Sequence, residues 1–95
     1  MTARTIPVAV LRLGRIVSTP NALRSLTRKD ILVGIQRHQA GDWGELTAPD
    51  WEANDRALTQ GGRIFSAYNA VNGTKFWIIT EADRSVTTVL LPEDY

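Results

Sequence analysis

Residues 63–80 read RIFSAYNAVNGTKFWIIT, and this stretch decides the fold. Two runs rich in aromatic and β-branched residues flank Asn72-Gly73, a dipeptide that favours a type I′ turn with positive φ at both central residues. We therefore predict a β-hairpin with strands at 63–71 and 74–80. A two-residue loop fixes the cross-strand pairs, which are Val71 with Thr74, Tyr68 with Trp77, and Ser66 with Ile79.

A third strand is predicted at 86–91, after a loop around 81–85, and Pro92 ends it because proline cannot donate a ladder hydrogen bond. Side chains alternate between the two faces of such a sheet. The more apolar face, which we assign to the helices, comprises Phe65, Ala67, Phe76, Ile78, Val89 and Leu91. The second face is amphipathic and comprises Ile64, Ser66, Tyr68, Lys75, Trp77, Ile79 and Thr88.

Cap residues upstream of the hairpin predict two to three short helices. Threonine is a favourable N-cap, an acidic residue three positions later forms a capping box, proline fits the first helical position, and glycine ends a helix. In chain order the predicted helices run from Thr19-Pro20 to Leu26, from Thr27 (with Asp30) to Gly41, and from Thr47 (with Asp50) to Gly61-Gly62.

Before the helices, residues 8–17 are rich in valine, leucine and isoleucine, which suits a strand with Gly14 as a bulge position. The fold class is therefore α+β: an N-terminal strand, two to three short helices, then a three-stranded antiparallel meander, in the order β-α-α-β-β-β. We expect residues 1–7 to form a flexible N-terminus and residues 8–95 to form a single α+β domain.

The composition is that of an ordinary globular domain, with 95 residues, 43% hydrophobic, 22% charged and no cysteine. Disulfides and thiolate metal sites are therefore excluded. No apolar run approaches the roughly 20 residues that span a bilayer, so we expect no membrane partner. Neither a secretory signal nor a transit peptide fits the first residues, and a cytoplasmic location is expected.

Charge is distributed unevenly between the two parts of the chain. Residues 1–29 contain no acid, whereas residues 30–95 contain ten acids and five bases. A basic segment of this kind can bind the phosphates of a nucleic acid, or it can fold against the chain's own acidic part or that of a partner. Its basic residues are Arg4, Arg12, Arg15, Arg24, Arg28 and Lys29.

Residues that could carry chemistry are few. His38 is the one histidine, so no zinc site and no Ser-His-Asp set is proposed, and we expect no catalytic residue, metal or cofactor. At the end of a helix, His38 is expected to pack its ring or to interact with the helix dipole. Asn54 and Asp55 lie on a helix face expected to be buried, where they either bond loop backbone groups or form a site beside the sheet.

The second face of the sheet is the best candidate for a partner-binding surface, because an exposed apolar patch with Trp and Tyr is typical of contact sites. The alternatives are that the N-terminal strand or a second copy of the chain covers it. Trp43 could be a recognition aromatic or fill the edge of the core, and Arg84 could serve a binding loop or a self-bonded turn. The predicted partner-binding residues are Ile64, Tyr68, Lys75, Trp77, Trp43 and Arg84.

Two stretches resemble a known family. Residues 41–58, GDWGELTAPDWEANDRAL, and residues 61–95, GGRIFSAYNAVNGTKFWIITEADRSVTTVLLPEDY, are similar to small "plasmid-related" proteins carried by prokaryotic mobile elements. The resemblance covers about Leu13 to Tyr95, and its ending WIITEADRSVTTVLLPEDY is its most specific part. It implies cytoplasmic cargo of a mobile element, and it assigns no activity to any residue.

The predicted element order is also similar to that of RelE/ParE-like toxins, which are small RNases or gyrase poisons. That resemblance implies acid, base and phosphate-clamp roles for Arg63, Tyr68, Lys75, Glu81 and Arg84. However, the acidic body of this chain is unlike an RNA-cleaving surface. The leading hypothesis is therefore a non-enzymatic accessory protein that binds a macromolecule, foremost another protein; the toxin and the nucleic-acid binder are the alternatives.

Overall fold

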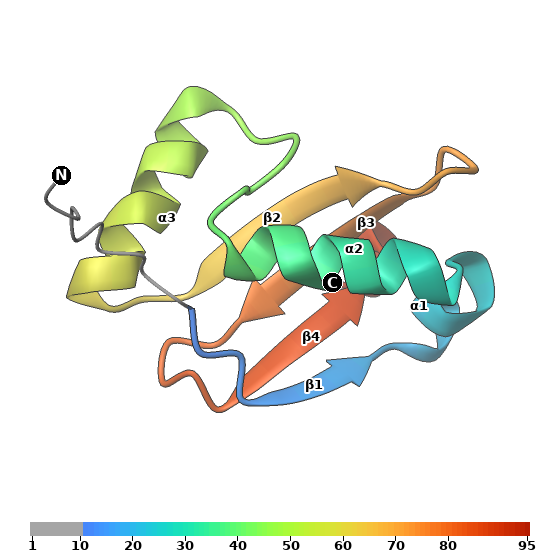
Figure 1. Cartoon of the computed structure of the whole chain (residues 1–95), viewed down its shortest axis with the longest axis horizontal. Helices are drawn as coiled ribbons and strands as arrows, with labels where there is room; N and C mark the ends of the chain where they lie inside the picture. Colours follow the sequence, from blue (N-terminus) through green and yellow to red (C-terminus); the bar gives the residue numbers. More distant parts are fainter. Residues whose placement is uncertain (1–10) are drawn as a thin grey trace, which may run out of the picture.

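The computed structural model describes residues 11–95. The predicted flexible N-terminus at 1–7 and the first part of the predicted strand, 8–10, lie outside the described residues. Figure 1 shows the helices and strands, which are β1 (Arg15–Ser18), α1 (Pro20–Ser25), α2 (Arg28–Gln39), α3 (Ala48–Gln60), β2 (Ile64–Asn69), β3 (Lys75–Thr80) and β4 (Val86–Leu90). A 3-10 turn, η1 (Pro92–Asp94), follows β4.

Local cap signals place the first two helices correctly. The Thr19 hydroxyl accepts a hydrogen bond from the Ala22 amide at the start of α1. At the start of α2, Thr27 and Asp30 form the predicted capping box, with both hydrogen bonds at 3.0 Å. These bonds satisfy amide groups that a helix leaves unpaired in its first turn.

The third helix also starts and ends where predicted, after Thr47 and at Gly61. The expected capping box with Asp50 is wrong, because the Thr47 side chain makes no cap hydrogen bond. Pro49 in the first turn lacks an N–H, so one of the donors that a cap would satisfy is missing. Gly61 takes φ +84°, a conformation that favours glycine at a helix end.

The sheet has four strands in the order β1-β4-β3-β2 and is mixed. The β2-β3 and β3-β4 pairs are antiparallel as predicted, but β1 adds to β4 in parallel, so the predicted three-stranded sheet is too small. The strand at 8–17 is also shorter than predicted, at 15–18 among the described residues. Gly14 precedes it instead of forming a bulge within it, and its φ of +62° brings the backbone against the carbonyl of Ser85.

The hairpin register differs from the prediction by one residue. Ala67 pairs with Trp77 and Tyr68 with Phe76. The loop has three residues, since the Ala70 carbonyl accepts from the Gly73 amide at 2.9 Å while the Ala70 amide donates to Thr74 at 2.8 Å. Gly73 has φ +87° but Asn72 does not have positive φ, so the type I′ turn is wrong.

A tertiary contact explains this loop. The carboxylate of Asp30, already used to cap α2, also accepts a hydrogen bond from the Val71 amide at 3.2 Å. The Asn72 side chain donates to the Ser25 carbonyl at 3.3 Å and accepts from the Thr74 amide at 3.0 Å. The α1-α2 corner therefore holds the hairpin loop in the three-residue form, which no local signal in residues 63–80 specifies.

A shift of one residue moves every side chain of one strand to the other face. For β2 this means that Ile64, Ser66 and Tyr68 lie on the helical side, where all three are buried. Phe65 and Ala67, assigned to the helices from the sequence, lie on the opposite side. The assignments of β3 are confirmed, since Phe76 and Ile78 are buried in the same cluster as Ala22 of α1.

The core lies between the sheet and α2, which crosses the sheet in Figure 1, while α3 lies beside β2. Gly34 of α2 allows this close approach, because a Cβ there would lie 2.8 Å from the Phe76 ring. A second cluster under α3 contains Leu11, Leu13, Trp43, Ala57 and Ile64. The helices thus cover one face of the sheet and leave the other face to the residues that form the site.

Candidate functional site

The sheet face turned away from α2, which we call the free face, carries a row of three aromatic rings. Phe65 and Trp77 meet edge to face, with ring centroids 4.9 Å apart and an interplanar angle of 86°. Tyr95 meets Trp77 in the same manner at 5.7 Å and 67°. Phe65 and Trp77 are half-buried, and Tyr95 is 71% exposed. This aromatic cluster is the main apolar feature of the free face.

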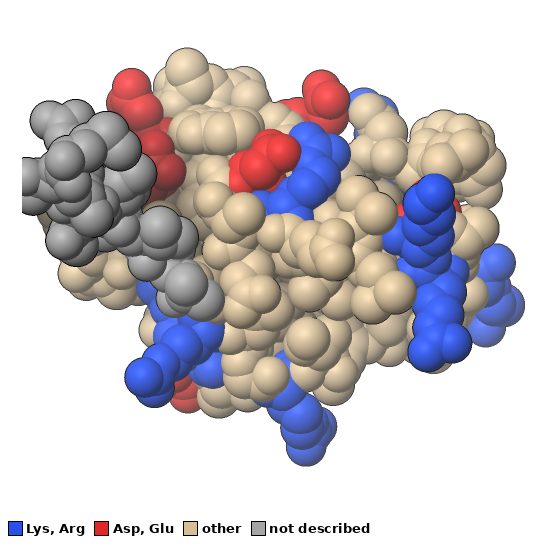
Figure 2. Space-filling view, in the orientation of Figure 1, with Lys and Arg blue, Asp and Glu red and all other residues tan. Residues whose placement is uncertain are grey.

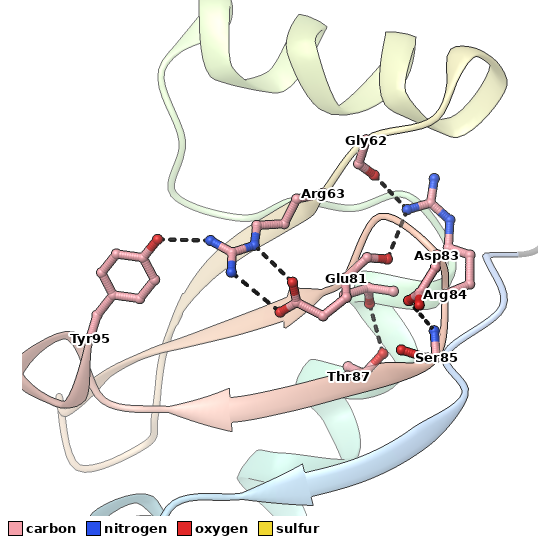
Figure 3. A network of polar contacts seen from close by, with 9 residues as sticks. Gly62, Arg63, Glu81, Asp83, Arg84, Ser85, Thr87 and Tyr95 are labelled. Atoms are coloured by element: carbon pink, nitrogen blue, oxygen red, sulfur yellow. Dashed lines mark hydrogen bonds and ion pairs between the residues drawn. The ribbon is translucent and has the colours of Figure 1, made fainter.

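Arg63 lies at one end of the aromatic cluster and is held from two sides (Figure 3). Its Nε and Nη2 donate to the two carboxylate oxygens of Glu81 at 3.2 and 3.4 Å, and its Nη1 donates to the Tyr95 hydroxyl at 2.8 Å. The hydrogen bonds that the guanidinium donates to Glu81 raise the pKa of Arg63. An exposed ion pair contributes little stability, but the two-oxygen geometry fixes the plane of the guanidinium.

Two shallow hollows flank the Phe65-Trp77 pair. The first, of about 260 Å³, is lined by Arg63, Phe65, Trp77, Ile79 and Tyr95. The second, of about 380 Å³, lies toward Lys75 and is bordered by the segment that leads into α3 and by Pro92. Both hollows share Phe65 and Trp77. The pair therefore forms a ridge with concave surface on each side, a shape that apolar side chains of a partner can fill.

The segment after β4 brings Tyr95 to this face. Asp94 anchors the segment, because its carboxylate accepts hydrogen bonds from the Thr19 hydroxyl at 2.6 Å, from Asn21 at 2.7 Å and from the Leu91 amide at 3.0 Å. These bonds, that from Thr19 foremost, lower the pKa of Asp94. The backbone is thus fixed up to Asp94, and Tyr95 is placed beside Trp77.

The structure divides the predicted partner-binding residues. Trp77 and Lys75 lie on or beside the free face, as predicted. Ile64 and Tyr68 do not, because the observed register turns them toward the helices, where they are 0% and 2% exposed. The Tyr68 hydroxyl donates to the Asp42 carbonyl at 2.6 Å, and burial raises its pKa to about 12. Their assignment to the surface is wrong.

Trp43 and Arg84 are also structural. Trp43 is fully buried, and its indole Nε1 donates to Asp55 at 3.0 Å. Arg84, at φ +62°, donates to the backbone carbonyls of Gly62 and Glu81 (Figure 3). It also donates to the carbonyl of Ala57 at 2.8 Å near the end of α3. The core-edge interpretation of Trp43 is confirmed, and its placement in a binding surface is wrong. Arg84 lies in a self-bonded turn, but it bonds backbone carbonyls and not an acid, and its role in binding stays a prediction.

Three residues of the site were missing from the predicted set: Arg63, Phe65 and Tyr95. Phe65 was assigned to the helices because of the register error. Tyr95 follows Pro92, and nothing local indicates that the chain folds back over the sheet after this proline. Arg63 directly precedes β2 and Glu81 directly follows β3. With the correct register, these two positions lie side by side at the same end of the hairpin, and this is the signal that could have identified Arg63.

His38 belongs to a sealed polar network. His38, Ser66, Thr80 and Thr87 are each 0% exposed. Since the Thr87 hydroxyl donates to the Leu13 carbonyl at 2.7 Å, Thr80 donates to Thr87, and His38 Nε2 must donate to Thr80 at 2.8 Å.

Burial lowers the pKa of His38 to about 4, so the ring is neutral. Because Nε2 carries the ring proton, Nδ1 accepts the hydrogen bond from the Ser66 hydroxyl at 2.5 Å. A substrate has no access to this Ser-His pair, which serves the core. Asn54 is likewise structural, because its amide bonds both the N–H and the carbonyl of Phe65.

The residues of the two alternative hypotheses do not gather at one place. The basic residues within 11–29 are split between the start of β1 and the α1-α2 corner. On the face drawn in Figure 2, Lys and Arg form separate groups around a broad uncharged area. Of the five toxin-like positions, Tyr68 is buried under the helices and Arg84 is bound to carbonyls, while Lys75 and Glu81 lie at opposite ends of β3.

No protein-family model, no curated protein sequence and no solved structure matches this chain. The resemblance to "plasmid-related" proteins therefore stays a prediction. Within residues 11–95, no group of three or more His, Cys, Asp or Glu side chains is placed to hold a metal ion. None of the helices in this range combines the length and the apolar character that crossing a membrane requires.

Proposed function

We propose that this chain is a non-enzymatic binding module that contacts another protein through the free face, with Trp77 at the centre of the interface. The observation that carries the proposal is the half-buried Phe65-Trp77 pair between two hollows, with Arg63 fixed at its end. Trp, Tyr and Arg are the residue types that contribute most to protein-protein binding energy. All three occur within this one cluster.

Charge favours a protein over a nucleic acid at this face. Arg63 is paired with Glu81, and Lys75 lines its hollow together with Glu45 and Asp50. Nucleic-acid binding rests on unpaired Lys and Arg side chains that neutralise phosphates. A mixed set of charges around an apolar centre is instead typical of the rim of a protein interface.

The proposal is tested by comparative capture from a prokaryotic lysate. The immobilised wild type, Trp77→Ala and Leu32→Ala are incubated with the same lysate, and captured proteins are quantified by mass spectrometry. Leu32 is 52% exposed on α2, on the other side of the sheet, so its variant controls for loss of an exposed apolar side chain. We expect at least one protein that Leu32→Ala retains and Trp77→Ala loses by about tenfold or more, as for a hot-spot residue.

Native mass measurement of the same three proteins separates a foreign partner from a second copy. If Trp77→Ala converts a dimer to a monomer, the free face is a homodimer interface. If both variants capture the same proteins as the wild type, and all three have the same mass, the proposed function is wrong. The folded state of Trp77→Ala is checked beforehand by its circular dichroism and its unfolding transition.

A further inference from the structure

Building on this proposed function, we infer that the surface formed by Arg63 and Trp77, at the edge of the smaller hollow, is a seat for a tyrosine side chain of the partner, and that Tyr95 lies on this seat in the free protein. The seat consists of Arg63 and Trp77, which contact Tyr95, and it borders the hollow that Phe65, Ile79 and Tyr95 itself also line. The chain itself therefore places a phenol ring against the surface that we propose for the partner.

Each part of the Tyr95 side chain has a partner in the seat. The ring lies edge to face on Trp77 at 5.7 Å, an arrangement that aromatic pairs prefer. The guanidinium of Arg63 lies 5.9 Å from the ring centroid and donates a hydrogen bond to the hydroxyl. The seat thus distinguishes tyrosine from phenylalanine, since a phenylalanine ring would leave the guanidinium without this acceptor.

Glu81 determines the charge of the ligand that fits. Its carboxylate binds Arg63 through two hydrogen bonds, so the pair carries no net charge. A phosphate or carboxylate at the hydroxyl position would lie next to the Glu81 carboxylate and be repelled. A neutral phenol avoids this repulsion, which is why we infer an unmodified tyrosine and not a phosphotyrosine.

Tyr95 can leave the seat without disturbing the fold. Its side chain is 71% exposed, and the side-chain hydrogen bonds that anchor the segment belong to Asp94. The Tyr95 amide donates to the Pro92 carbonyl at 3.2 Å, a backbone bond that rotation of the Tyr95 side chain leaves in place. Rotation of one residue therefore opens the seat. In the free protein Tyr95 competes with the partner, and the apparent affinity falls by the fraction of molecules in which the seat is open.

The test uses N-acetyl-L-tyrosine amide as the probe, titrated into ¹⁵N-labelled full chains, with the Trp77 indole N–H resonance as the readout. The proteins are the wild type, Tyr95→Ala, and Glu93→Ala as a matched control in the same turn. We expect Tyr95→Ala to bind the probe about tenfold more tightly than either other protein if Tyr95 fills the seat nine-tenths of the time. The resonances of Trp43 and Trp51 should not move.

N-acetyl-L-phenylalanine amide provides the second comparison. We expect it to bind Tyr95→Ala more weakly than the tyrosine probe does, and we expect this preference to vanish in Tyr95→Ala/Arg63→Leu. Equal affinities of wild type and Tyr95→Ala, or equal affinities of the two probes for Tyr95→Ala, would overturn the inference. Such a result leaves the capture experiment unaffected, so the seat and the proposed function fail separately.

Discussion

Ala67 lies directly opposite Trp77 across the β2-β3 ladder, and both line the larger hollow of the free face. The small alanine side chain leaves one flank of the indole open, while Phe65 and Tyr95 contact its other edges. Trp77 therefore forms part of the exposed free face and is not a residue of the buried core. The consequences of this arrangement can be measured through stability and through binding.

Substitution of two tryptophans should have different effects on stability. Trp43→Ala removes a fully buried ring together with its hydrogen bond to Asp55, and should lower the free energy of unfolding by about 3–5 kcal/mol. Trp77→Ala removes a half-buried ring at the surface and should cost less than about 2 kcal/mol. Urea unfolding measures both, and equal losses would contradict the position of Trp77 on the free face.

Gly34→Ala should destabilise the protein although alanine is the better helix former. The new Cβ would lie 2.8 Å from Cε2 of Phe76 and 3.1 Å from Cδ1 of Ile78, so α2 or the Phe76 ring must move. We expect a loss of about 1–3 kcal/mol, as for other overpacked cores. Gln36→Ala, at an exposed position of the same helix, is the control and should be neutral or slightly stabilising.

The unfolding free energy should depend on pH through His38. Burial lowers its pKa from the ordinary value of 6.5 to about 4, so the folded state favours the neutral ring. The contribution is therefore complete above pH 6.5, and it is lost as the pH falls from 6.5 to about 4. The slope in this window should be about 1.4 kcal/mol per pH unit, and the total about 3 kcal/mol.

The matched variant for this prediction is His38→Gln, which retains hydrogen-bonding groups but cannot titrate. It should be less stable at pH 7, and its stability should be flat between pH 6.5 and 4. The carboxylates with lowered pKa, such as Asp42 beside Arg37, lose their contribution only below this window. An unchanged slope in His38→Gln would show that another group produces the pH dependence.

Arg84→Ala should destabilise the fold without affecting binding at the free face. The variant removes the hydrogen bonds to the carbonyls of Ala57, Gly62 and Glu81, which tie the end of α3 to the β3-β4 loop. Hydrogen bonds from a charged donor contribute about 1.5–3 kcal/mol. Arg56→Ala, at an exposed position of α3, is the control. A variant with full stability but lost capture would instead assign Arg84 to the interface.

Short-range signals in the sequence predicted the helices well. The Thr27-Asp30 capping box and the Gly41 stop depend on groups within a few residues of each other, so the pattern is sufficient. The antiparallel order of β2, β3 and β4 was also predicted, because consecutive strands joined by short loops pair with each other. The α+β class therefore follows from the sequence.

Long-range contacts determined what the sequence could not predict. The hairpin register depends on the hydrogen bond from the Val71 amide to Asp30. The addition of β1 to the sheet depends on the close approach of Gly14 to the Ser85 backbone. One misplaced residue in the loop was enough to put Ile64 and Tyr68 on the wrong face and to hide Phe65 from the predicted site. Trp77 was placed on the correct face because the register error changed the face of the β2 side chains and not that of the β3 side chains.

Site-specific photo-crosslinking tests the central claim most directly. Benzoylphenylalanine is introduced at Lys75, exposed beside the free face, or at Gln36, exposed on α2, and each protein is irradiated in the lysate used for capture. We predict that a partner crosslinks to position 75 and not to position 36, and that adding Trp77→Ala abolishes the product. A partner that crosslinks to position 36 instead, or that crosslinks to position 75 regardless of Trp77, would contradict this account.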